Sequence, residues 1–369
     1  MNKSRVIIKK SSYDYSELKP VIFSIMDSLC PNMIRPGSWV VLKPNLLAPA
    51  LPDKAIVTHP LVVKSIAEYA LNKGAKVQIS DSQAMGTFEK VLKESGLREE
   101  LKGLDVEFKE FKKSVKIDVG GPFKAIEIAE DAINADVLIN LPKLKTHVQM
   151  LMTLGVKNLF GCIVGMKKPE WHFRTGVNRE MFAELLVRIH NAVNPSITIL
   201  DGILAMEGEG PGRSGVPREA GVVAGSSNAI ALDITICRLL GLDSFGVLTN
   251  KAAKALGHVP DDIEVQGEMP VIKDFKFPGI TPLVFGPKKL HGLMRRHLVQ
   301  RPVAGDAACR LCGECWKYCP AKAISAGKKS VHFDYEKCIR CYCCIEVCPH
   351  GALKTAEPFA GRIIRKIKG

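Results

Sequence analysis

The sequence predicts an α/β protein in which a mostly parallel sheet is covered by helices, followed by a small α+β domain at the C-terminus. Short apolar runs rich in β-branched residues alternate with segments of helical periodicity up to about residue 298. Hydrophobic residues make up 46% and charged residues 24% of the 369, as is usual for globular proteins. Nine of the 12 cysteines follow residue 308. We therefore expect one domain at 1–298 and a second at 299–369.

The expected elements of the first domain follow one another in a regular order. Apolar runs predict strands at 5–9, 39–43, 76–80, 104–108, 135–140 and 197–200. Apolar residues at helical spacing, bounded by Gly, Pro and capping residues, predict helices at 14–30, 60–73, 86–96 and 229–240. Strands that are apolar throughout are typical of parallel sheets with both faces covered, whose ligands bind beyond the carboxyl ends of the strands. We therefore expect functional residues where strands end.

Two cysteine runs with the same spacing dominate the second domain. Each run reads Cys-x2-Cys-x2-Cys-x3-Cys-Pro, the bacterial ferredoxin spacing, and two runs in tandem indicate two [4Fe–4S] clusters in a ferredoxin-like domain. Three cysteines of a run bind one cluster, and the fourth binds the other cluster. Cluster I is expected to bind Cys309, Cys312, Cys315 and Cys348, and cluster II to bind Cys338, Cys341, Cys344 and Cys319.

Other uses of these cysteines fit the pattern less well. Disulfides would staple a small secreted domain, but the N-terminal segment does not resemble a signal peptide. Zinc sites take four ligands, usually as two separated pairs. Cys343 lies off the spacing and is expected to be a spectator thiol, while Cys30 and Cys237 are expected in the core. Cys162 is the remaining thiol to test for reactivity.

Charge and hydropathy restrict the expected partners. The formal net charge is +14, and two clusters of about 2− each would reduce it to about +10. This excess fits an anionic small-molecule substrate or an acidic redox partner protein. Aromatic residues are only 6% and no nucleic-acid-binding module is recognisable, so we expect no nucleic-acid partner. No apolar run approaches the roughly 18 residues of a membrane span, so we expect a cytoplasmic protein. Basic segments at 290–298 and 362–368 flank the cysteine runs.

The densest group of candidate site residues begins at Asn140. Five lysines, an arginine and two histidines lie within about 32 residues, with no acidic residue between Asn140 and Lys168. Such a run is unlike a solvated helix face, and a bound anion would complement the buried positive charge. We expect the substrate-binding residues to be Lys43, Asn45, Asn140, Lys145, Lys157 and Asn158. His147 and Lys143 are expected to be catalytic, His147 by moving protons, although a lone histidine such as His147 or His172 often serves the structure alone.

The roles of three further features are left open by the sequence. The start of the helix at Thr58–Pro60, beside Lys43, is either an anion seat or only a well-capped helix. The loop at 208–215 has four glycines, so its backbone can approach a ligand closely, but it lacks the phosphate-binding and dinucleotide fingerprints. Asp233, in an apolar helix, is either paired with a cation or faces a ligand.

These segments resemble a known family. The resemblance rests on Lys43-Pro44-Asn45, Thr58-His59-Pro60, the block from Asn140 to His147, the block from Val156 to Gly161, Asp201-Gly202 and the glycine-rich loop at 208–215. They are similar to those of the domain-of-unknown-function 362 family, whose members are often fused to a C-terminal ferredoxin module. The resemblance covers nearly the whole chain. It implies cluster binding and a polar site in the first domain, without naming a substrate.

The sequence favours a redox protein whose two clusters relay electrons to or from an anionic substrate in the first domain. One alternative is a non-catalytic electron-transfer or cluster-handling protein that docks an acidic partner. Another is a non-redox enzyme that acts on an anionic metabolite and keeps its clusters as structural supports.

Overall fold

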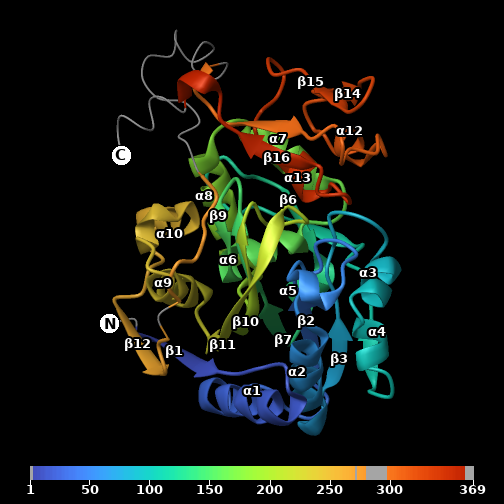
Figure 1. Cartoon of the computed structure of the whole chain (residues 1–369). Coiled ribbons are helices and arrows are strands. Elements are labelled where there is room, and N and C mark those ends of the chain that lie inside the picture. Colours follow the sequence, from blue (N-terminus) through green and yellow to red (C-terminus); the bar gives the residue numbers. More distant parts are fainter. Residues whose placement is uncertain (1–2, 271, 280–296, 362–369) are drawn as a thin grey trace.

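The computed structural model describes residues 3–270, 272–279 and 297–361. The predicted fold class is confirmed, with a mostly parallel mixed sheet covered by helices and a small C-terminal module. Figure 1 shows this module, in orange and red, over one end of the sheet. Most of the basic segment at 290–298, and the basic tail at 362–368, lie outside the described residues. The predicted domain boundary after residue 298 stays a prediction.

One sheet of ten strands forms the centre of the first domain. Its main path runs through β12 (Asp262–Gly267), β1 (Lys3–Lys10), β11 (Gly215–Ser226), β10 (Ile197–Gly208), β7 (Val137–Leu141), β2 (Trp39–Pro44), β3 (Lys76–Ile79) and β4 (Val106–Phe108). Neighbouring strands from β10 to β4 are parallel, and β11 runs antiparallel to β10 and β1. β8 (Lys143–His147) pairs with β10 and with β9 (Leu151–Thr153). Local sequence did not predict β8, because its pairing depends on a strand far along the chain.

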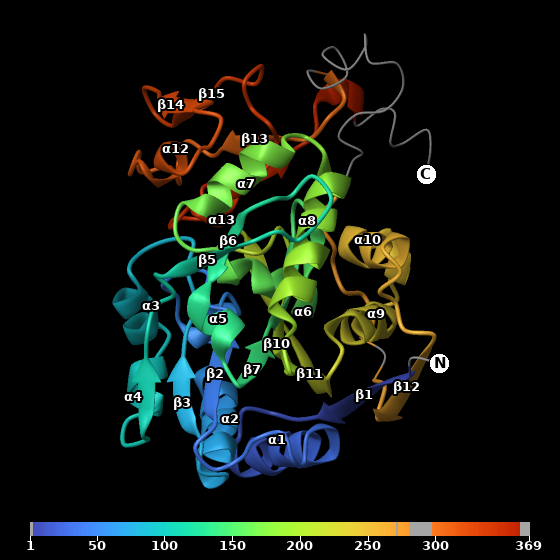
Figure 2. The same ribbon diagram turned by 180° about the vertical axis from the view of Figure 1, so that it is seen from behind.

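Helices cover both faces of this sheet (Figure 2). One face packs against α1 (Tyr15–Leu29), α2 (Pro60–Asn72), α3 (Phe88–Glu94) and α4 (Leu97–Glu100). The other packs against α5 (Glu130–Asn134), α6 (Gly155–Asn158), α8 (Arg179–Val193), α9 (Ala229–Leu239) and α10 (Leu248–Ala255). Successive side chains of a strand point to opposite faces, so Val40 and Leu42 enter one core and Val41 enters the other. This explains why β2 is apolar throughout.

The C-terminal module, here called the cluster module, has little regular structure. It contains the antiparallel pairs β13 (Arg301–Ala304) with β16 (Leu353–Ala356) and β14 (Ile324–Ala326) with β15 (Val331–Phe333), and the short helices α12 (Glu314–Lys317) and α13 (Cys343–Glu346). Val148, just after β8, is fully buried in the core of this module. The carboxylate of Glu209 accepts hydrogen bonds from the backbone and hydroxyl of Thr355, the backbone bond at 3.0 Å. The module is therefore docked on the first domain.

Candidate functional site

Eight cysteines of the cluster module form two groups of four. One cavity is lined by Cys309, Cys312, Cys315 and Cys348, and a second by Cys319, Cys338, Cys341 and Cys344. These are the two groups that the spacing predicts, with the last cysteine of each run reaching the group of the other run. Their roles as cluster ligands stay predictions.

Both groups fit an iron–sulfur cubane. Each iron of a [4Fe–4S] cluster takes one thiolate, so four sulfurs must surround a space instead of converging on one point. Among the residues that the structure describes, no three His, Cys, Asp or Glu side chains converge as a single metal ion requires. All 12 cysteines are free of disulfide bonds. The sulfurs thus line two cavities in the two groups that the ferredoxin spacing predicts.

The two cysteine groups differ in their surroundings. Cys312 of the first group is exposed, whereas Cys341 and Cys344 of the second are buried. Cys343, the thiol that lies off the spacing, lines the second cysteine cavity and also a larger pocket. The first group therefore has one thiol in solvent and two that are buried, and the second lies against that pocket.

The pocket has a volume of about 270 Å³ and lies between the first domain and the cluster module. The first domain contributes residues that follow β2 and β3, residues of β8, β9 and α6, and the start of α7 (Lys167–Thr175). The module contributes Tyr318, Cys343, Glu346 and Val347. Carboxyl ends of parallel strands thus meet α13, which carries Cys343 and Cys344, and this matches the expected position of a ligand site.

Four of the six predicted substrate-binding residues line this pocket, namely Asn45, Lys145, Lys157 and Asn158. The amide of Asn45 donates to Asn158 at 2.8 Å, and the amide of Asn158 donates to Asn140 at 2.8 Å. Lys145 Nζ donates to Asn45 Oδ1 at 2.6 Å and to the carbonyl of Ile56 at 2.7 Å. Burial, followed by the nearby charge of Lys157, lowers the pKa of Lys145 to about 7. Asn140 does not line the pocket, but its hydrogen bond with Asn158 helps to fix a residue that does.

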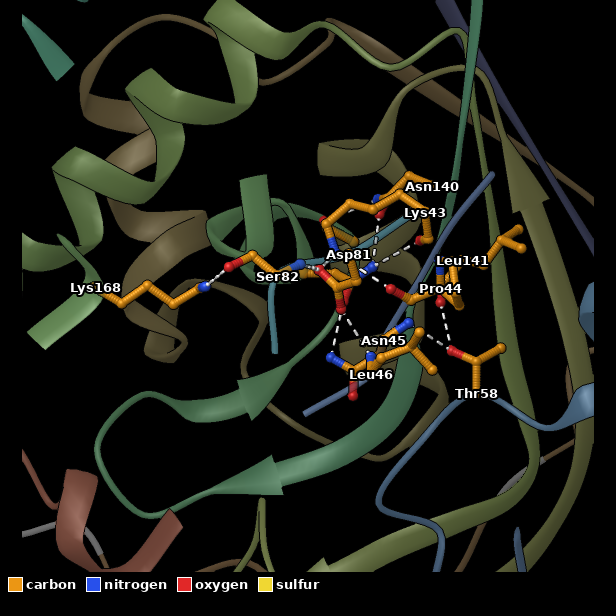
Figure 3. Close-up of polar contacts among 12 residues, drawn as sticks. Lys43, Pro44, Asn45, Leu46, Thr58, Asp81, Ser82, Asn140, Leu141 and Lys168 are labelled. Carbon is orange, nitrogen blue, oxygen red and sulfur yellow. Dashed lines mark hydrogen bonds and ion pairs between the residues drawn. The ribbon is translucent and has the colours of Figure 1, made fainter. Parts of the chain in front are cut away.

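Lys43 is held by the chain itself (Figure 3). Its Nζ atom lies 2.8 Å from Asp81 Oδ1, and the Lys43 side chain is fully buried. Asp81 also accepts hydrogen bonds from the backbone N–H groups of Leu46 and Ser82, at 2.8 and 2.9 Å. A Cβ atom at Gly161 would meet Lys43 Nζ at 2.6 Å, so the glycine leaves room for the ion pair. Asp81, and not a ligand, neutralises Lys43.

Lys143 also has an internal partner. Its Nζ atom lies 2.8 Å from both Asp201 Oδ2 and Tyr13 Oη, and both charged side chains are fully buried. The backbone N–H of His59, the N-cap of α2, donates to Asp201 at 2.9 Å. Asp201 therefore provides the negative charge beside this helix start, which favours the interpretation of a well-capped helix. Lys143 does not line the pocket.

Lys157 differs from these lysines. Within the described residues its ammonium group has no hydrogen bond or ion pair, and it lines the pocket. Burial lowers the pKa of Lys157, and Glu346 of the cluster module opposes this shift.

Asp233 accepts hydrogen bonds from the backbone N–H groups of Gly155 and Val156, at 2.7 and 3.0 Å. Asp233 is thus neither paired with a cation nor facing a ligand, because it holds the turn that presents Lys157.

His147 connects the two domains. Its Nδ1 atom accepts from the backbone N–H groups of Gln149 and Met150, at 3.1 and 3.3 Å, so the proton of the neutral ring lies on Nε2. Nε2 lies 3.1 Å from Glu346 Oε1. Burial lowers the pKa of His147 to about 4. Burial raises the pKa of Glu346, but the nearby His147 and Lys157 lower it by more. The pKa of Glu346 therefore falls to about 2. His147 lies behind Glu346 and does not line the pocket.

Several polar atoms on the pocket wall are buried without a hydrogen-bond partner in the described structure. They are Gln83 Oε1, Thr153 Oγ1, His172 Nδ1 and Glu346 Oε1. Buried polar groups are paired in most native proteins, so a group of unsatisfied atoms around one cavity indicates a ligand or ordered water there.

Sequence reasoning missed part of this site. Ser82 and Glu346 were not predicted, because Ser82 is an ordinary strand-end serine and Glu346 lies among the cluster cysteines. The glycine-rich loop approaches the cluster module as well as the pocket, which its Pro211 lines. A Cβ atom at Gly212 would lie 2.9 Å from the carbonyl oxygen of Glu346, so this close approach is to the cluster module.

Comparisons with known proteins agree with this architecture. Residues 40–238 match the model of the domain of unknown function DUF362, and residues 308–352 match a 4Fe-4S dicluster domain. The chain belongs to the DUF362 family. The resemblance predicted from the sequence is thereby confirmed, and the DUF362 match covers all of the pocket residues that come from the first domain.

Three individual proteins are also similar to this chain. The DUF362 chain is 35% identical over 309 residues to a thylakoid-associated protein of Synechocystis, covering 81% of this chain and 96% of the relative. It is 35% identical over 79 residues to the electron transport protein HydN of Escherichia coli, which is 21% of this chain and 41% of HydN. It is 39% identical over 57 residues to pyruvate synthase subunit PorD of Thermotoga maritima, which is 15% of this chain and 58% of PorD. These findings support an iron–sulfur electron-transfer role.

No helix among the described residues combines the length and the apolar character needed to cross a membrane. The cytoplasmic location stays a prediction, since one relative is described as thylakoid-associated.

Proposed function

We propose that this DUF362 protein transfers electrons between two [4Fe–4S] clusters in the cluster module and an anionic small molecule in the pocket. The main support is the position of Cys343, which lines both the pocket and the second cysteine cavity. A ligand in the pocket would therefore lie one side chain away from cluster II. Bound clusters would supply one-electron steps.

The chain's own residues would bind and orient the ligand. Lys157 would donate to an acidic group of the ligand, because its ammonium is the pocket cation for which the described residues provide no partner. Asn45 and Asn158 would be held in fixed orientations by their amide chain. Glu346 keeps a negative charge near Lys157, and its contact with His147 holds α13 against the first domain. The predicted catalytic roles of His147 and Lys143 would thus be indirect.

The test is anaerobic purification followed by native mass spectrometry, which weighs the bound clusters and any retained ligand. The retained molecule is then added to dithionite-reduced protein, and reoxidation of the clusters is followed by visible absorbance. Replacing Lys157 by Met should slow ligand-driven reoxidation by about tenfold or more, the effect of losing one charge-assisted hydrogen bond. The exposed Lys251, which pairs with Glu180, gives a matched Lys251→Met control that should behave like the unaltered chain.

Two results would contradict the proposal. Clusters that cycle while no small molecule is retained would favour the electron-carrier alternative, with an acidic partner protein in place of a substrate. A retained molecule that changes chemically without any change in cluster absorbance would favour the non-redox enzyme.

A further inference from the structure

The start of α7 forms a distinct part of the pocket wall. α7 lies beside the cluster module in both views of the chain (Figure 1, Figure 2), and Met166, Lys168 and Pro169 from its start line the pocket. No side chain caps the first turn of this nine-residue helix. A helix N-terminus carries partial positive charge, which an anion would complement.

Lys168 lies on the pocket wall, and few groups of the described chain compensate its positive charge. It is 9% exposed, and within the described residues its Nζ atom donates only to Ser82 Oγ, at 2.7 Å (Figure 3). An ammonium group has three protons, so two remain for a ligand. No carboxylate of the described chain lies within ion-pair distance of Lys168. The nearest acids are already engaged, since Asp81 pairs with Lys43, and Glu110 accepts from Gln83 at 2.8 Å.

Ser82 has a proton to donate. Its Oγ atom accepts hydrogen bonds from Lys168 Nζ and from the backbone N–H of Gly165, the latter at 3.0 Å. Both lone pairs of the hydroxyl are therefore occupied, and its own proton must point elsewhere. Ser82 lines the pocket, so that proton is available to a ligand.

His172 supplies an independent observation. It lies one helical turn after Lys168, is 4% exposed and lines the pocket, and its Nδ1 atom is buried without a partner in the described structure. Burial lowers the pKa of His172 to about 3, so the ring is neutral near pH 7 and can donate one N–H.

We propose that Ser82, Lys168 and His172 seat an oxyanion group of the pocket ligand, a carboxylate or a phosphate. This inference rests on the proposed function in taking the pocket as a ligand site, and it adds a second contact point to Lys157. The two lysines have different surroundings. Burial has the largest effect on the pKa of both lysines. The charged groups that next affect the pKa are Glu346 and Cys343 for Lys157, and Asp81 and Lys43 for Lys168. The ligand would therefore be anchored at α7 while another part of it reaches Lys157 and the wall next to cluster II.

The test measures anion binding without electron transfer. Equilibrium dialysis of the anaerobically purified full chain with radiolabelled inorganic phosphate, and separately with malonate, distinguishes the two kinds of acidic group. Replacing Lys168 by Met should weaken binding of the preferred anion by about tenfold or more, from the loss of a charge-assisted hydrogen bond. Lys251→Met is again the matched control, because the exposed Lys251 pairs with Glu180 and does not line the pocket, and it should change affinity by less than about twofold.

A second variant guards against misfolding. Ser82→Ala removes one donor, and it should also weaken binding while the cluster absorbance and its bleaching by dithionite stay unchanged. Equal affinity in the unaltered and Lys168→Met chains, or no binding of either anion at millimolar concentration, would refute the proposed anion site. Binding that depends on Lys168 would uphold it even if no bound molecule exchanged electrons with the clusters, so the two proposals can fail separately.

Discussion

The buried pair of Lys43 and Asp81 allows a test of which lysines serve the fold and which serve a ligand. Lys43 is fully buried and its Nζ atom lies 2.8 Å from Asp81 Oδ1 (Figure 3). Breaking a buried ion pair costs about 3–5 kcal/mol, because it leaves one charge in the interior without its partner. In a Lys43→Met chain Asp81 keeps its hydrogen bonds from the backbone N–H groups of Leu46 and Ser82, so the loss should lie near about 3 kcal/mol.

The reverse change should cost more. In an Asp81→Asn chain the Lys43 ammonium would keep one backbone acceptor, the carbonyl of Pro44 at 3.2 Å, so the loss should approach about 5 kcal/mol. The double variant should be less destabilised than the sum of the two single variants, because neither charge remains.

Urea unfolding of the purified chain, followed by tryptophan fluorescence and far-UV circular dichroism, measures these differences. Lys102→Met is the control, since Lys102 and Glu99 form an exposed pair at 3.8 Å whose loss should change stability by less than about 0.5 kcal/mol. A Lys43→Met chain that loses less than about 1 kcal/mol but binds anions more weakly would refute the reasoning, because Lys43 would then serve a ligand and not the fold.

The remaining predictions concern the clusters, acid stability and docking of the module. Cys348→Ala and Cys319→Ala should each remove one cluster and about half of the iron, measured by iron assay and electron paramagnetic resonance, and unchanged iron in either variant would contradict the crosswise sharing. Burial lowers the pKa of His59 from 6.5 to about 4. The folded chain therefore binds this proton less readily than the unfolded chain, so His59 by itself should lower the free energy of unfolding by up to about 1.4 kcal/mol per unit as pH drops from about 6.5 to 4, in addition to the like contributions of His147 and His172. In urea titrations His59→Asn should flatten that slope, and an equal slope would exclude His59 as its source. Gly212→Ala places a Cβ atom 2.9 Å from a carbonyl oxygen of α13, so the module should be cut more readily by limited proteolysis, whereas Gly305→Ala, 3.8 Å from its nearest neighbour, should not change cleavage.

The amino-acid sequence by itself determined the fold class, the cluster module and the grouping of its cysteines. These depend on patterns that are local in the chain. Continuous apolar runs predict buried parallel strands, and a cysteine spacing that repeats within one short segment predicts where each sulfur must lie. The expectation that functional residues follow strand ends also proved useful, since Asn45 follows β2 and Ser82 follows β3 on the pocket wall.

Only the tertiary structure decided which of the lysines has a charge to offer. In the sequence, Lys143 and Lys157 look equally free, because no acid lies near either one along the chain. Folding brings Asp201, 58 residues further along, to Lys143, while Lys157 stands on a turn whose capping carboxylate already binds two backbone N–H groups. Coulombic attraction depends on distance in space and on burial, not on separation in sequence. A pattern of residues therefore indicates how many charges must be compensated, and only the packed structure shows which of them remain for a ligand.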